Sequence, residues 1–261
     1  MISYAQNRED VVLDRAFSGL DRGFYIDVGA EHPVLNSVTK HFYDHGWRGI
    51  NIEPSPASLA ALEKERPDDV NLGVGVADFE RSSTLFLGPL EHHGESTFRQ
   101  DLADRYRREG CEFTEIDDVS VTTLARIREQ HVGERTIDFL KIDVEGYEAA
   151  VIAGADWHTF RPRVVVVEAT YPNSRTPSHA AWEPALLTAG YLFGLFDGLN
   201  RFYARAEEPG LVEALSSPAC VFDDYVEFGV SRRIEQLKTQ NAELELDLKR
   251  SRSIARRSLQ N

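Results

Sequence analysis

The chain has 261 residues, of which 42% are hydrophobic, so it is long enough for one large domain or two small ones. Its formal net charge is −14, with −18 in residues 1–230 and +4 in residues 231–261, and an acidic body argues against nucleic acid as a partner. No apolar run is long enough to span a bilayer. We expect a cytoplasmic protein, because no signal peptide is visible and the two cysteines, Cys111 and Cys220, fit free thiols.

The first informative stretch is GFYIDVGA at residues 23–30, which follows an amphipathic helix expected over residues 3–20. It predicts a short buried strand that ends on Asp27, with Gly29 and Ala30 in the turn after it. In open α/β sheets, ligands bind at the carboxyl ends of the strands, and small residues let the backbone approach them closely. A carboxylate at this point suits hydroxyl groups or an amine.

The turn lacks the phosphate-binding pattern G-x-G-x-x-G, because Gly29 is followed by Glu31 and His32. A carboxylate in this turn would also repel a pyrophosphate. The pattern therefore favours S-adenosylmethionine over NAD, since the ribose, amine and sulfonium of that cofactor call for hydrogen-bond acceptors or negative charge.

A second strand is expected at residues 48–53, RGINIE, and it ends on Glu53-Pro54. An acid at the end of the second strand, about 20 residues after the glycine turn, reaches the ribose hydroxyls of an adenosine. The alternative is that Glu53 caps the helix that follows it. A third strand is expected at residues 71–77 and ends on Ala77-Asp78, which would lie near the adenine.

The polar stretch from residue 88 to residue 120 is the least regular part of the sequence, and we expect a loop that contacts the substrate. It carries His92 and His93, which are either solvated or catalytic. Three arginines follow on a helical segment, and we interpret them as a solvated face. The alternative is that they contact a phosphorylated or acidic substrate.

The segment TIDFLKIDVEG at residues 136–146 predicts a fourth buried strand with Asp143 and Glu145 at its end. In an open sheet this strand lies beside the first, so both acids would reach the same crevice as Asp27. Carboxylates gathered there take part in chemistry or bind a cation, because burying them otherwise is costly. Mg²⁺ is possible but not favoured, since no Asp-Asp pair or nearby Asn ligand is present, and we predict no metal ligands.

The valine run RVVVVE at residues 163–168 predicts a fifth strand that is buried on both faces and ends on Glu168. Two further strands, at residues 191–196 and 201–205, are joined by Asp197-Gly198, which is typical of a hairpin. We expect this hairpin to add an antiparallel edge to a parallel sheet.

The composition changes at about Val230, where apolar residues recur at heptad positions up to Ala255 with a single Asn241 among them. Such an Asn sets the register of dimeric coiled coils. The sequence therefore predicts a domain over residues 1–229 and a tail over 230–261, which is either a coiled coil that binds a second copy or a partner protein through residues 230–258, or a lone frayed helix.

Taken together, these segments resemble the FkbM-type methyltransferase family, within the class I S-adenosylmethionine-dependent methyltransferases. The resemblance covers roughly residues 3–225 and rests on the segments SYAQNREDVVL, GFYIDVGAEHP, SVTKHFYDHGWRGINIEP, IDFLKIDVEGYE, RPRVVVVEATYPNS and LFDGLNRFY. It implies an α/β fold with a Rossmann-like, seven-stranded, mostly parallel sheet whose last strand is reversed. It also implies methyl transfer to an oxygen atom, commonly a sugar hydroxyl in glycan, polysaccharide or glycosylated natural-product assembly.

The resemblance assigns roles by motif. Asp27 and Gly29 would contact the methionine end of the cofactor and Glu53 its ribose, while Asp78 would flank the adenine. Asp143 and Glu145 would face the transferred methyl group, and the remaining predicted cofactor contacts are Ala30, Pro54 and Ala77. The family often has Asn after the Gly-Ala pair, and Glu31-His32 departs from that pattern.

A sugar hydroxyl is a poor nucleophile, so we expect a base beside it. The candidates, ranked with the rigidly placed strand-end acids first, are Asp143, Glu145, Glu168 and His32, with His92 or His93 from the loop. Two other functions stay open. A nicotinamide-dependent enzyme of the same fold is disfavoured by the missing glycines, and a non-catalytic scaffold tethered by its coiled coil is disfavoured by the intact strand-end acids.

Overall fold

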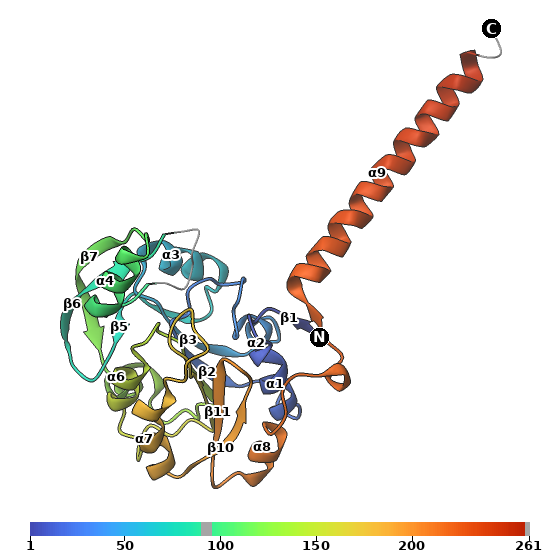
Figure 1. Ribbon diagram of the computed structural model, residues 1–261. Helices are drawn as coiled ribbons and strands as arrows, with labels where there is room; N and C mark the ends of the chain where they lie inside the picture. Colours follow the sequence, from blue (N-terminus) through green and yellow to red (C-terminus); the bar gives the residue numbers. More distant parts are fainter. Residues whose placement is uncertain (90–95, 259–261) are drawn as a thin grey trace. The chain divides into compact units, whose positions relative to one another are not determined.

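A seven-stranded sheet forms the centre of residues Tyr4–Asp223 in the computed structural model, which describes residues 1–89 and 96–258 (Figure 1). The predictions for His92 and His93 lie outside the described residues. Across the sheet the strands follow the order β10 (Tyr191–Phe196), β11 (Asn200–Arg205), β9 (Val164–Glu168), β8 (Phe139–Ile142), β2 (Phe24–Val28), β3 (Arg48–Ile52) and β4 (Val70–Leu72).

The chain crosses the sheet in two directions from β2. It runs outward through β3 to β4 and then returns to the other side of β2, where β8 and β9 pair in parallel. The strand order therefore reverses between β2 and β8, as the sequence predicts for its first and fourth strands. In such sheets this reversal opens a crevice at the carboxyl ends of the strands.

The reversed strand is not at the edge, which corrects the prediction for the hairpin. β11 runs antiparallel to β9 on one side and to β10 on the other, so β10 forms the edge and runs in the same direction as β9. Phe202, Tyr203 and Ala204 of β11 are fully buried, whereas much of β10 is exposed. The more buried strand of the hairpin thus occupies the inner position, although β10 (YLFGLF) is more apolar in sequence than β11 (NRFYAR).

Both faces of the sheet are buried, as the valine run of β9 requires. Alternate side chains of β2 enter different apolar clusters: Phe24 and Ile26 belong to one, and Tyr25 to the other. The helices are α1 (Glu9–Ala16), α2 (Lys40–Asp44), α3 (Pro56–Glu65), α4 (Gln100–Arg108), α5 (Leu124–Ile127), α6 (Glu148–Ala153), α7 (Glu183–Thr188), α8 (Pro209–Ala214) and α9 (Phe228–Ser258). A π-helical turn, Arg128–Val132, extends α5.

The strand predicted at residues 71–77 is divided between two sheets. β4 belongs to the large sheet, whereas β5 (Gly75–Val76) pairs with β7 (Thr114–Thr122), which also pairs with β6 (Arg81–Leu87). This three-stranded sheet lies beside α4 (Figure 1). Residues 96–120 are therefore more regular than the sequence suggests, because they contain α4 and most of the long strand β7.

The second unit of the chain consists of residues Met1–Ser3 and Asp224–Asn261. Its strands β1 (Ile2–Ser3) and β12 (Val226–Glu227) pair in parallel, and α9 follows directly. Within the described residues, no helix is both long enough and apolar enough to cross a membrane. Cys111 and Cys220 are free thiols, as predicted.

Candidate active site

A cavity of about 920 Å³ opens where β2, β3, β8 and β9 end. Its volume is within the range of small-molecule sites. The acidic side chains in its lining are Glu31, Glu53, Asp143, Glu145 and Glu168, and the one basic side chain among its described lining residues is Lys141. Its apolar wall includes Ile52, Val76, Leu85, Leu87 and Phe98.

The turn after β2 is built around a contact within the protein. Gly29 has a φ of +79°, and a Cβ atom at this position would lie 1.9 Å from the carbonyl oxygen of Asp143. The N–H groups of Gly29 and Ala30 both donate to the carbonyl oxygen of Ile52. Glycine is therefore required at position 29 because the β8 backbone approaches it closely, whether or not a ligand also does.

Glu53 directly follows β3, and its carboxylate is held by two backbone donors. Oε2 accepts the N–H of Glu31 at 2.9 Å and Oε1 that of Ser55 at 2.8 Å. Burial raises the pKa of Glu53 to about 7, and these two hydrogen bonds oppose the rise. Each oxygen keeps a lone pair for a hydroxyl donor. The N-cap of α3 is Ser55, so Glu53 does not cap the helix itself; it orders the turn that leads into α3, and a ligand-binding role for it stays a prediction.

Lys141 links three groups at the ends of β2 and β8, namely Asp27, Asp143 and the backbone of Gly29. Its Nζ lies 3.3 Å from Oδ1 of Asp27 and 3.6 Å from Oδ2 of Asp143, and it donates to the carbonyl oxygen of Gly29 at 2.7 Å. Burial lowers the pKa of Lys141, but the neighbouring carboxylates of Asp27 and Asp143 raise it further than burial lowers it. Sequence reasoning missed this lysine, because it lies within a buried apolar strand.

Asp27 does not line the cavity. Besides Lys141, its carboxylate contacts Thr39, which donates to Oδ2 at 3.0 Å. A role for Asp27 in cofactor binding stays a prediction, and of the two carboxylates beside Lys141 it is Asp143 that lines the cavity.

The acidic turn after β8 is fixed from both sides. Glu145 and Gly146 have positive φ angles of 52° and 86°. Glu148 Oε1 accepts the N–H groups of Val144 and Gly146, and the hydroxyl of Thr97 donates to the carbonyl oxygen of Glu145 at 3.1 Å. Burial, followed by the charge of Asp143, raises the pKa of Glu145 well above its ordinary value. A carboxylate with a raised pKa is thus held on a rigid turn.

Glu168 is a buried carboxylate of the cavity with one oxygen left unsatisfied by the described residues. It ends β9 with 7% of its surface exposed, and its buried Oε2 has no hydrogen-bond partner among residues 1–89 and 96–258. Burial raises its pKa strongly, and the charges of Asp143 and Glu145 raise it further. Such a group holds its proton until a positive charge or a donor arrives.

Three other predicted residues are placed away from the cavity lining. His32 uses Nδ1 to accept the N–H groups of Val34 and Leu35, so its ring orders the turn that follows it. Ala77 is fully buried, and Asp78 is exposed. Ala30 and Pro54, in contrast, line the cavity. The roles assigned to His32, Ala77 and Asp78 stay predictions.

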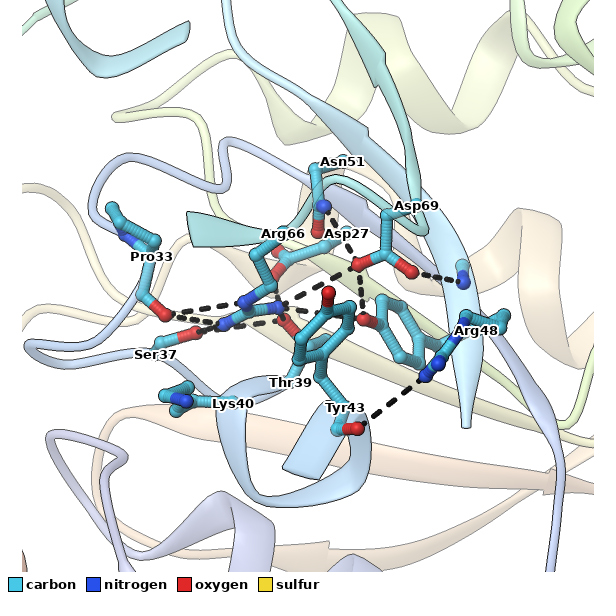
Figure 2. Close-up of polar contacts among 12 residues, drawn as sticks. Asp27, Pro33, Ser37, Thr39, Lys40, Tyr43, Arg48, Asn51, Arg66 and Asp69 are labelled. Carbon is cyan, nitrogen blue, oxygen red and sulfur yellow. Dashed lines mark hydrogen bonds and ion pairs between the residues drawn. The ribbon is translucent and has the colours of Figure 1, made fainter. Parts of the chain in front are cut away.

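A buried arginine holds the loop that carries Glu31 and Asn36 to the cavity. Arg66 donates to the carbonyl oxygen of Pro33, to Ser37 at 2.6 Å and to Thr39 at 2.8 Å (Figure 2). Its Nη1 lies 4.0 Å from Asp69, which in turn accepts from Tyr25, Gly49 and Asn51. This network continues through Thr39 to Asp27. It could not be predicted, because Arg66 lies in a run of charged residues.

Comparison with known proteins shows to which family of α/β enzymes the chain belongs. Residues 27–193 match the family described as "Methyltransferase FkbM domain". The chain belongs to the FkbM methyltransferase family. No curated protein sequence matches the chain. Among solved structures, it is similar to a TehB-like SAM-dependent methyltransferase from Corynebacterium glutamicum, with 8% sequence identity and a TM-score of 0.36 over 76% of this chain and 87% of the other. That likeness is too slight to bear on its chemistry.

The matched segment contains every cavity acid of this FkbM protein, from Glu31 in the first turn to Glu168 at the end of β9. Among the described residues, no group of three or more His, Cys, Asp or Glu side chains is placed to hold a metal ion.

Proposed function

We propose that this methyltransferase transfers the methyl group of S-adenosylmethionine to a hydroxyl oxygen, most simply that of a sugar, with Glu168 as the base. The observation that carries the proposal is the cluster of Asp143, Glu145 and Glu168 in one cavity, in which a buried oxygen of Glu168 has no hydrogen-bond partner in the described part of the chain. Family membership supports the methyl transfer, while the choice of an oxygen acceptor rests on the carboxylates.

The residues present fit this cofactor. Glu53 offers two fixed carboxylate oxygens for the vicinal hydroxyls of a ribose, at the end of the strand next to β2. Ile52, Val76 and Phe98 form an apolar wall for the adenine of the cofactor. The lining holds five carboxylates against one lysine, which suits a cation. When bound, S-adenosylmethionine supplies an electrophilic methyl group on a positively charged sulfur.

Glu168 is a better candidate for the base than Asp143. Asp143 is ion-paired with Lys141, so its carboxylate already has a cationic partner. Glu168 has no such ion pair among residues 1–89 and 96–258, and its raised pKa makes its carboxylate a stronger proton acceptor. A positive charge in the cavity lowers the pKa of Glu168 and releases its proton, which leaves the carboxylate free to accept the proton of the acceptor hydroxyl.

The first test is calorimetric titration with S-adenosylmethionine and S-adenosylhomocysteine, with NADH as the control. We expect both sulfur compounds to bind and NADH not to bind. Transfer of a labelled methyl group is then measured on a panel of neutral, amino and acidic sugars. Binding of NADH alone would overturn the cofactor assignment. Binding of S-adenosylmethionine without transfer to any sugar would overturn the acceptor assignment.

A further inference from the structure

The surface of α9 carries an apolar stripe that the proposed catalytic function does not use. The stripe consists of Val230, Ile234, Leu237, Leu244 and Leu248, with side chains between 43% and 66% exposed. Their spacing alternates between four and three residues, apart from the place that Asn241 fills. This is the a/d pattern of a coiled coil, with Ile234, Asn241 and Leu248 at a and the others at d.

A lone helix of this kind is poorly stabilised. Most helical stability in proteins comes from packing an apolar face against a partner, and α9 leaves its apolar face in water along the whole described stripe. The ion pair of Lys238 with Glu235 is exposed and contributes little. The helix therefore requires a second apolar helix face.

We propose that α9 is a dimerisation element that pairs, parallel and in register, with α9 of a second copy of this chain. Asn241 identifies the occupant, because a buried amide at an a position is best satisfied by the same residue of an identical helix. In the central part of the stripe, Ile234 at a, Leu237 and Leu244 at d and the single Asn at a also favour two strands over three or four.

The alternative antiparallel pairing is less favourable. The alignment that keeps the a/d layers would place Asn241 against Leu244 of the other helix, which leaves two buried amides without partners. The parallel alignment brings Arg233 near Lys238 of the other helix, but this like-charge pair is exposed to solvent. Exposed charge pairs contribute less than buried unpaired amides, so the parallel alignment is favoured.

Two neighbouring leucines provide a matched test. Leu244 is at position d of the stripe, whereas Leu246 is at f on the outer side, and their side chains are 66% and 49% exposed. In the full chain we expect Leu244→Ala to raise the dimer dissociation constant at least about 100-fold and Leu246→Ala to leave it nearly unchanged. Analytical ultracentrifugation from micromolar to submillimolar protein measures both. A monomeric wild type, or equal effects of the two substitutions, would overturn the proposal.

The orientation is tested by cross-linking. In a background with Cys111→Ser and Cys220→Ser, Val230→Cys should form a disulfide between two chains on mild oxidation. In the antiparallel alignment the two residues at 230 would be separated by roughly 37 Å, because 25 residues of helix would lie between them. A dimer that fails to cross-link would overturn the parallel arrangement. These experiments require no cofactor or acceptor, so their outcome is independent of the proposed function.

Discussion

Two regions of the same sheet bury charged groups in opposite ways. Around Arg66, every nitrogen of the guanidinium donates a hydrogen bond, and both oxygens of Asp69 accept one (Figure 2). At the other region, Glu168 has a buried oxygen without a partner among the described residues, and it lies near further acids. A satisfied charge network supports the fold, whereas an unsatisfied carboxylate in a cavity calls for a ligand.

The largest effect that this comparison predicts is on catalysis. Glu168→Gln keeps the shape of the side chain but removes the proton acceptor, so methyl transfer should fall about 10²- to 10⁴-fold. The rate is measured at saturating S-adenosylmethionine, with the exposed Glu80→Gln as the control. Retention of the wild-type rate would exclude Glu168 as the base.

At the hydrogen-bonded network around Arg66 we expect a loss of stability instead of a loss of catalysis. Arg66→Met removes a buried cation, which leaves Asp69 without its ion-pair partner and the carbonyl oxygen of Pro33 without the two donors of Arg66, so the free energy of unfolding should fall by about 3–5 kcal/mol. Chemical denaturation measures the loss. Arg108→Met, at an exposed position of α4, serves as the control and should change little. A loss below about 1 kcal/mol would show that the network does not stabilise the fold.

Glu53 combines features of the two regions, since its carboxylate is hydrogen-bonded by the backbone and also lines the cavity. Glu53→Ala should weaken S-adenosylhomocysteine binding by roughly 10- to 100-fold, the value of a hydrogen bond to a charged group. Calorimetry tests this against Glu63→Ala, an exposed acid of α3. Equal affinities in the two variants would remove Glu53 from the cofactor site.

Glu168 should also make stability depend on pH. Its pKa in the folded protein is raised above the ordinary value of 4.5, so its stabilising contribution is complete below pH 4.5 and is lost as the pH rises toward its folded pKa. From pH 5 to pH 8, the ligand-free wild type should therefore lose at least about 1 kcal/mol relative to Glu168→Gln. Denaturation at both pH values is the measurement, and parallel pH curves for the two proteins would contradict a raised pKa.

The smallest effect is expected at His32. Its Nδ1 accepts two backbone N–H groups, and Asn could offer an oxygen for the same bonds. His32→Asn should therefore keep methyl transfer within about tenfold of the wild type, less than the loss that removal of a base causes. A loss as large as that of Glu168→Gln would instead return His32 to the list of bases.

The sequence predicts the parallel strands well, because their signals are local. The valine run of β9, and the acids at the ends of β3 and β9, can be recognised in the sequence without knowing which strands lie beside them. The inner position of β11 could not be read, because it depends on which strand of a hairpin packs better against β9. β7 was missed because TEIDDVSVT carries three acids and remains largely exposed.

The candidate site shows the same division between local and long-range information. Asp143, Glu145, Glu168 and Glu53 were found from their places at strand ends, and all line the cavity. Lys141 and Arg66 were not, because a lysine in a strand and an arginine in a charged run have no distinctive local pattern. Their roles follow from contacts with residues distant in the sequence, such as Asp27 and Pro33.

The close contact between Gly29 and Asp143 has a consequence for tolerance to mutation. A methyl group at position 29 would collide with the backbone of β8, so even Ala would have to push β2 and β8 apart at the point where the acids emerge. In a saturation mutagenesis experiment, position 29 would accept glycine alone, whatever the cofactor. Invariance at this position would then report how two strands meet and would carry no information about the ligand.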